Sequence, residues 1–203
     1  MFASQHMVQL VRRAATPHPQ KSPFDAFVYY LDDWHKTTLA SNKRAKGDVW
    51  ESFCKRYLDI IMSEQYEDTW LLRDTPSELL EHLKMYNGRK DMGIDMIARR
   101  RDGGYVAVQC KYKQPHKDGY IPKTKRRMRY NRVNWGELKT FQELCASTGP
   151  WHSILVMTNG KNIVWTYDNL GTVDRCELTY KNFINLTTID MCRIAGEVAN
   201  LNI

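Results

Sequence analysis

The sequence predicts an α/β domain (mixed α+β) in which helices flank a mixed central β-sheet. The turn signal Asp102-Gly103-Gly104 separates two strand-like stretches, 93–99 and 105–112, and so predicts a β-hairpin. A helix expected over 135–147 stands between the second of these strands and a further strand at 152–158. Strands joined through a helix run parallel, whereas hairpin strands run antiparallel, so the two connections together predict a mixed sheet with a strand-helix-strand crossover.

Amphipathic helices are expected before the sheet and at the end of the chain. Apolar residues recur every three to four positions over 24–38 and again over 49–62, where Gly47-Asp48 is expected to provide the N-cap. Glu51 lies at the edge of the apolar stripe of the second helix rather than on its solvent side. The other expected elements are strands at 69–73, 162–167 and 172–178 and helices at 77–85 and 189–200.

Length and composition bound the organisation of the chain. Its 203 residues, 42% hydrophobic and 26% charged, are typical of one globular domain. Residues 1–23 contain no acid and hold three prolines, so we expect a disordered tail, with an organellar transit peptide as the alternative. Residues 24–203 then form a single domain with its core at about 47–170. No apolar run approaches the roughly 20 residues of a membrane span.

The cysteines favour a reducing environment. There are five, an odd number, and no two are spaced as Cys-x-x-Cys, which disfavours a disulfide scaffold and a structural zinc site. We therefore expect an intracellular protein, with the nucleus, the cytoplasm and an organelle all left open.

The positive charge of the chain is concentrated in one segment. Residues 112–132 form an expected insertion that holds eight basic residues and one acid, so the segment alone carries the chain's net charge of +7. Such a patch suits a polyanion such as DNA, and a solvated loop is the alternative. The residues expected to bind nucleic acid are Lys113, Lys117, Lys123, Lys125, Arg126, Arg127, Arg129 and Arg132.

The predicted hairpin places polar side chains where a plain core strand would have none. Side chains alternate between the two faces of a strand, so Gln109 and Lys111 share one face and Cys110 lies on the other. Asp95 stands between Ile94 and Met96 on the preceding strand. Burying an unpaired carboxylate is costly, and either a metal ion or an ion pair with Lys111 would offset that cost.

Asp95 followed by Gln109-x-Lys111 resembles the PD-(D/E)xK nuclease superfamily, in its Mrr-like branch of restriction-endonuclease-like domains. The matching stretches are Gly-Asp-Val-Trp-Glu at 47–51, Met-Gly-Ile-Asp-Met-Ile-Ala at 92–98 and the segment 102–111. The likeness is to the nuclease domains at the N-terminus of large superfamily 2 helicases and related restriction enzymes. It implies a restriction-endonuclease-like core and metal-assisted hydrolysis of phosphodiester bonds in DNA.

The resemblance also implies a role for each residue of the motif. Asp95 would bind Mg²⁺ or Mn²⁺, and the amide oxygen of Gln109 and the main-chain carbonyl of Cys110 would be further ligands. Lys111 would orient the attacking water and stabilise charge on the phosphate, while Glu51 would complete the metal shell, directly or through a water. Gln109 stands where the superfamily usually has an acid, which leaves one-metal and two-metal chemistry open.

Three other functions stay open from the sequence. One is a catalytically inactive nucleic-acid-binding module of the same fold that acts with a helicase. Another is a structure-specific nuclease of the Holliday-junction resolvase type, and a cysteine-dependent enzyme using Cys110 is the third. The chain has no GxxxxGK[ST] loop, so a helicase or other ATPase partner would be a separate chain or a missing part. Cutting both strands of a duplex would argue for a homodimer, because one such site cuts one strand.

Overall fold

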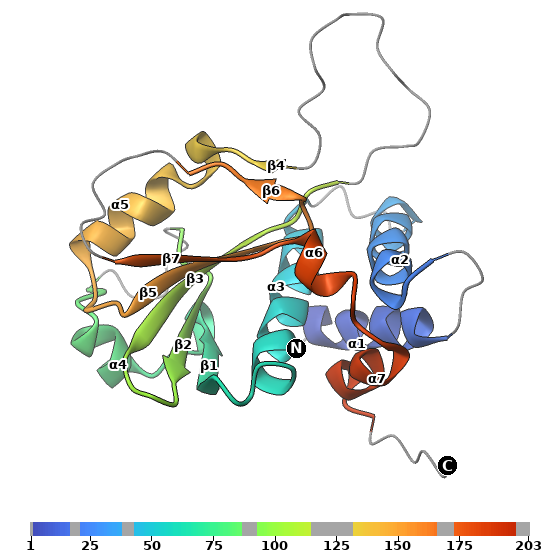
Figure 1. The fold of residues 1–203 in the computed structure, drawn as a ribbon, viewed down its shortest axis with the longest axis horizontal. Helices are drawn as coiled ribbons and strands as arrows, with labels where there is room; N and C mark the ends of the chain where they lie inside the picture. Colours follow the sequence, from blue (N-terminus) through green and yellow to red (C-terminus); the bar gives the residue numbers. More distant parts are fainter. Residues whose placement is uncertain are drawn as a thin grey trace, which may run out of the picture.

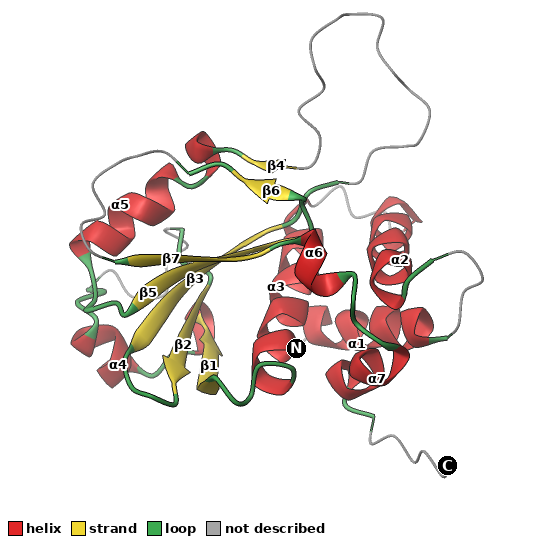
Figure 2. Cartoon of the chain, in the orientation of Figure 1, coloured by secondary structure: helices red, strands yellow, loops and turns green. Residues whose placement is uncertain are grey.

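The computed structural model describes residues 2–16, 21–37, 43–86, 93–114, 132–165 and 173–197. Five strands form one mixed sheet in the order β1-β2-β3-β5-β7 (Figures 1 and 2). The strands are β1 (Tyr66–Leu71), β2 (Met96–Arg100), β3 (Tyr105–Lys111), β5 (Ser153–Thr158) and β7 (Asp174–Leu178). β1, β2 and β3 pair antiparallel, whereas β3, β5 and β7 pair parallel, which confirms the expected hairpin, crossover and mixed sheet.

Helices cover both faces of this sheet. Figure 1 shows α3 between the sheet and a group of three further helices. The helices on this side are α1 (Phe2–Ala15), α2 (Pro23–Thr37), α3 (Lys43–Ile60) and α7 (Thr188–Ala195), and the opposite face carries α4 (Ser77–His82) and α5 (Lys139–Ser147). Shorter elements are the 3₁₀ helices η1 (Leu72–Asp74) and η2 (Trp135–Glu137), the helix α6 (Tyr180–Phe183) and a separate two-stranded sheet of β4 (Arg132–Val133) and β6 (Asn162–Ile163).

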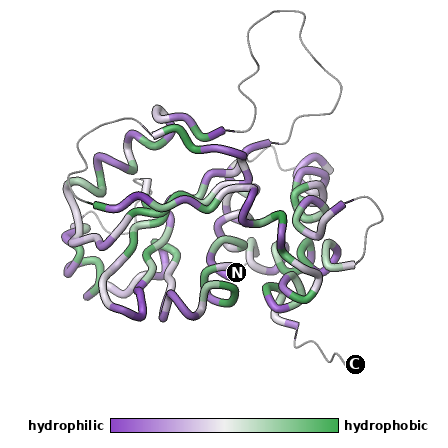
Figure 3. Tube along the Cα trace, in the orientation of Figure 1, coloured by the Kyte–Doolittle hydropathy of each residue, from purple (hydrophilic) through white to green (hydrophobic). Residues whose placement is uncertain are grey.

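Alternation along the strands divides the core into two clusters. Val106 and Val108 of β3 pack with the side of α1, α2, α3 and α7, whereas Ala107, between them, packs with the side of α4 and α5. In Figure 3 the helices carry both hydrophobic (green) and hydrophilic (purple) residues, as expected for helices that bury only one face. Within the described part of the chain, no helix is long and apolar enough to cross a membrane.

The prediction of a disordered tail over residues 1–23 is wrong for residues 2–15, which form the helix α1. Five apolar side chains of this helix are buried, and α1 packs against α2, α3 and α7. They lie at three- and four-residue spacing, which is the pattern of one helix face. The prolines that suggested disorder lie beyond the end of the helix. The five buried residues are Met7, Leu10, Val11, Ala14 and Ala15.

The N-terminus of α3 also differs from the expectation. The helix begins at Lys43, so Gly47 and Asp48 lie inside it and do not provide its N-cap. A glycine inside a helix costs about 1 kcal/mol relative to alanine, a cost that packing along the rest of the helix offsets. The extra turn extends the helix face that carries Glu51.

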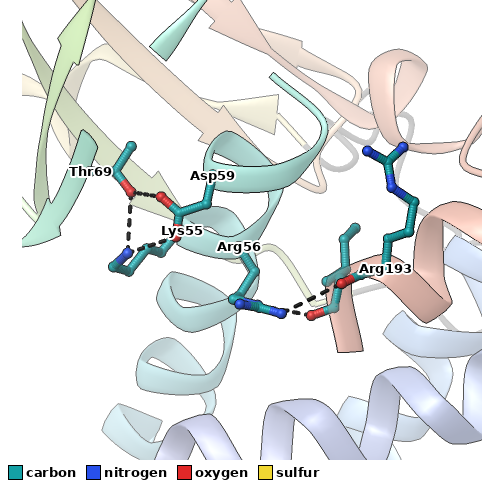
Figure 4. A network of polar contacts seen from close by, with 6 residues as sticks. Lys55, Arg56, Asp59, Thr69 and Arg193 are labelled. Atoms are coloured by element: carbon teal, nitrogen blue, oxygen red, sulfur yellow. Dashed lines mark hydrogen bonds and ion pairs between the residues drawn. The ribbon is translucent and has the colours of Figure 1, made fainter. Parts of the chain in front are cut away.

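Polar contacts fix the C-terminal half of α3 (Figure 4). Asp59 accepts a hydrogen bond from the Thr69 hydroxyl of β1 and lies 2.7 Å from Lys55 Nζ. Arg56 Nε donates to the Ile194 carbonyl of α7 at 3.0 Å. This end of α3 is therefore tied both to the sheet and to the last described helix.

Replacing Gly47 with alanine should stabilise the fold. A Cβ built at this position meets no atom within 4 Å, so the substitution gains helix propensity without a clash. We expect the free energy of unfolding to rise by about 0.5–1 kcal/mol. Urea denaturation followed by circular dichroism measures this, and a lower denaturation midpoint would contradict the helical assignment of Gly47.

Candidate active site

Four segments that are distant in sequence border a cavity of about 530 Å³ at the end of β3. They are the first turns of α3, the end of β1 with η1, the residues just before β2 and the last residues of β3. The cavity therefore brings together every residue that the sequence assigned to catalysis or metal binding. These are Glu51, Asp95, Gln109, Cys110 and Lys111.

The backbone of Asp95 is held on two sides. Its N–H donates to the Val108 carbonyl at 2.9 Å, which extends the β2–β3 pairing by one residue. Its carbonyl accepts from the Leu72 N–H of η1, also at 2.9 Å. Asp95 itself precedes β2, which begins at Met96, so the expected strand starts later than predicted. The hairpin and η1 together fix the position from which the carboxylate projects.

The carboxylate of Asp95 is bound by the opposite strand of the hairpin. Oδ2 accepts from the Cys110 N–H at 2.6 Å and from the Gln109 amide nitrogen. Hydrogen bonds to an ionised acceptor are strong, and Gln109 is only 3% exposed, so these two donors stabilise a negative charge inside the site. Gln109 here contacts Asp95 rather than a ligand, and its amide group still carries an acceptor oxygen.

Lys111 closes the cavity at the last residue of β3, opposite Thr158 of β5. Two residues later, Lys113 forms an ion pair with Glu137. Partial burial would raise the pKa of Glu137, but the Asn134 N–H bond and the charges of Lys113 and Lys111 together lower it. Glu137 therefore carries a negative charge near both lysines and engages Lys113 directly.

Beyond Lys111, the described part of the basic segment is small. Lys113 pairs with Glu137, and Arg132 Nε donates to the Asn134 side chain at 2.8 Å. The other six residues expected to bind nucleic acid lie outside the described residues: Lys117, Lys123, Lys125, Arg126, Arg127 and Arg129.

The wall supplied by α3 contains residues that sequence reasoning missed. Arg44, Gly47, Asp48 and Glu51 all line the cavity, and their spacings of three, four and seven place them on one helix face. Arg73 of η1 lines it as well, with a side chain 48% exposed. The spacing to Glu51 could have revealed the helical residues, whereas no local pattern marks Arg73. The cavity therefore combines acidic and basic walls.

Cys110 contributes backbone rather than thiol chemistry. Its side chain is buried, as is that of Cys54 on α3, and neither forms a disulfide. Burial is the largest factor that raises the pKa of both thiols. A buried, protonated thiol is a poor nucleophile, which argues against the cysteine-dependent enzyme.

The donor set suits a hard divalent cation. The carboxylates of Asp95 and Glu51 line the cavity together with the Gln109 amide. Cys110, whose main-chain carbonyl is the fourth expected ligand, lines it as well. Oxygen donors of this kind match Mg²⁺ and Mn²⁺. In the described ranges, no group of three or more His, Cys, Asp or Glu side chains forms a metal cluster, so an amide and a carbonyl would have to complete the set.

Comparison with known proteins identifies the family of the chain. The family model described as restriction endonuclease matches residues 57–172, which is more than half of the chain. The match includes Asp95, Gln109 and Lys111 and begins after Glu51. Searches of curated proteins and of solved structures found no match.

Proposed function

Because the chain belongs to the restriction endonuclease family, as an Mrr-like domain of the PD-(D/E)xK type, we propose that it is a metal-dependent endonuclease that hydrolyses phosphodiester bonds in DNA. The observation that carries this proposal is the shared cavity. Asp95, Gln109 and Lys111 come from one hairpin and Glu51 comes from α3, and all four border the same space. A purely structural hairpin would not require an acid, an amide and an ammonium group around one cavity.

The residues that line the cavity would have separate roles in metal binding and in catalysis. Asp95, Glu51, the Gln109 amide oxygen and the Cys110 carbonyl would hold Mg²⁺ or Mn²⁺, which when bound polarises a phosphate and lowers the pKa of water. The Cys110 N–H donates to the Asp95 carboxylate and so orients it. Lys111 would orient the attacking water and place its ammonium charge beside the phosphate as negative charge develops there.

Phosphate groups of DNA would also contact the basic walls of the cavity. Arg44 and Arg73 lie on different walls, on α3 and η1, so they could hold the backbone on either side of the bond to be cut. The net charge of the basic segment would add contacts further along the strand.

Removing Arg73 should reduce the salt dependence of DNA binding. For Arg73→Ala we expect the slope of log K against log salt to fall by about 1, because one phosphate contact is lost. Arg101→Ala is the matched control, since Arg101 is exposed in the β2–β3 turn at the opposite end of the hairpin. Fluorescence anisotropy across a salt series measures both variants with Ca²⁺ replacing the catalytic metal. Equal slopes for the two variants would exclude Arg73 from the interface.

The proposal is tested with the unmodified chain on two substrates. Supercoiled plasmid and a labelled four-way junction are incubated with Mg²⁺, Mn²⁺ or EDTA. We expect nicking that requires the metal and occurs on the plasmid. Strong preference for the junction would identify a resolvase instead. Salt-sensitive binding without cleavage in either metal would support the inactive binding module, with Gln109 as the first residue to explain the lost chemistry.

A helicase partner, which follows from the family resemblance, and a homodimer, which follows from one site cutting one strand, remain predictions. Size-exclusion chromatography with light scattering, with and without DNA, tests the homodimer. A monomer that nicks only one strand would agree with a single site per chain.

A further inference from the structure

A buried polar cluster lies behind the α3 wall of the cavity. Lys46 of α3 forms an ion pair with Asp32 of α2 at 2.5 Å, and both side chains are about one-tenth exposed. The Lys46 ammonium also lies 5.1 Å from the centre of the Tyr112 ring. Tyr112 directly follows Lys111, so the cluster joins α2 and α3 to the end of the strand that carries the proposed active site.

Tyr112 is held by two helices. Its ring meets that of Trp50 edge-on, with centroids 5.9 Å apart, and Trp50 lies one turn after Lys46 on the same face of α3. Its hydroxyl donates to the Val28 carbonyl of α2 at 3.4 Å. Burial, and then the nearby Asp32 carboxylate, raise the pKa of Tyr112 well above its ordinary value, so the phenol stays protonated and can donate.

We propose that Asp32, Lys46 and Tyr112 are positioning residues that set the distance between the α3 wall, with Glu51, and the end of β3, with Lys111. The proposal rests on the proposed function, because it concerns the geometry of the same site. Lys46 lies next to Gly47 and two residues before Asp48, both of which line the cavity. Holding Lys46 against Tyr112 therefore fixes the first turns of α3 relative to Lys111.

Two members of this cluster lie outside the matched part of the chain. Asp32 and Lys46 precede residue 57, where the family match begins, whereas Tyr112 lies inside it. The C-terminal half of α3 has its own anchors, Asp59 to β1 and Arg56 to α7. The cluster supplies the corresponding anchor for the half that borders the cavity.

The test must separate positioning from simple stability. Removing one partner of a buried ion pair leaves the other charge uncompensated and destabilises the fold, whereas an apolar pair of similar volume is often tolerated. The test variant is therefore the double substitution Asp32→Leu with Lys46→Met. Tyr112→Leu is a second variant, which loses the ring contacts with Lys46 and Trp50 and carries the test if the double variant does not fold. Lys55→Met, which removes an ion pair at the other end of α3, is the control.

Two readouts are measured on each folded variant. One is Mn²⁺ affinity, from electron paramagnetic resonance of free Mn²⁺, and the other is the single-turnover cleavage rate. Mutating residues that orient metal ligands lowers metal affinity or activity by about 10- to 100-fold. We therefore expect Mn²⁺ affinity and the cleavage rate each to fall by at least about tenfold in the double variant and in Tyr112→Leu. Lys55→Met should leave Mn²⁺ affinity unchanged.

The outcomes distinguish this inference from the proposed function. Wild-type Mn²⁺ affinity and cleavage rate in either folded test variant would overturn the positioning role while leaving the nuclease intact. A wild-type chain that binds Mn²⁺ but does not cleave DNA would overturn the function, and Mn²⁺ affinity would still decide the positioning role. A wild-type chain with neither Mn²⁺ binding nor cleavage would overturn both.

Discussion

Lys111→Ala should lower the single-turnover rate of DNA cleavage by about 10²- to 10⁴-fold, because it removes the ammonium group expected to orient water and to stabilise charge on the phosphate. Lys111 is the last residue of β3 and borders the cavity beside Gln109 and Cys110. DNA affinity should change far less than the rate, since one positive charge among several phosphate contacts is lost. Rapid-quench kinetics with excess enzyme measure the rate, and anisotropy measures the affinity.

Lys113→Ala is the matched control for this variant. Lys113 lies two residues further along the same segment, but its ammonium pairs with Glu137 and does not line the cavity. Its removal should therefore alter binding at most and leave the single-turnover rate at saturating DNA within about threefold, since a surface charge acts mainly on association. Equal losses in the two variants would mean that Lys111 acts only as one more basic contact.

Gly93→Ala should both destabilise the fold and abolish cleavage. Gly93 has φ +105°, where an L side chain is strained, and a Cβ there would lie 3.0 Å from the backbone nitrogen of Phe141 in α5. Strain and overlap with a helix backbone together should cost about 3 kcal/mol or more. Any shift that relieves the overlap moves the segment that leads into Asp95, two residues later.

Gly103→Ala separates the effect of backbone strain on stability from the effect of overlap with α5. Gly103 has φ +97°, but a Cβ there meets nothing within 4 Å, so only the strain of the backbone remains. It should cost about 1 kcal/mol and leave cleavage intact. Chemical denaturation of both variants measures the difference. Equal destabilisation by Gly93→Ala and Gly103→Ala would show that a Cβ at position 93 makes no steric clash with α5.

The sequence was sufficient to predict the hairpin and the residues it carries into the site. The turn fixes the register of the hairpin, and this register places Asp95, just before β2, beside the end of β3 that carries Gln109 and Lys111. The periodicity of one helix placed Glu51 at the edge of its buried face, whereas the assignment of all four residues to one site came from the family resemblance. In each case a local pattern determined which side chains share a face.

Other parts of the site depend on contacts that no local pattern contains. α1 is stabilised by packing on α2, α3 and α7, which are distant in sequence, so its lack of acids and the prolines beyond it were misleading. The extra turn of α3, which begins at Lys43, brings Arg44 to the cavity. Arg73 reaches the cavity because η1 hydrogen-bonds to the Asp95 backbone, a contact that only the tertiary structure reveals.

Asp95→Asn tests the central claim, that the end of the hairpin is a metal-dependent nuclease site, most directly. Asparagine keeps the shape of the side chain and an oxygen that can accept from the Cys110 N–H, but it removes the charge expected to hold the cation. Nicking of supercoiled plasmid is followed for the wild-type chain and this variant in Mg²⁺, in Mn²⁺ and in EDTA. We expect metal-dependent nicking by the wild-type chain and none by Asp95→Asn at equal thermal stability. Nicking by the variant at the wild-type rate, or nicking by the wild-type chain in EDTA, would contradict the account.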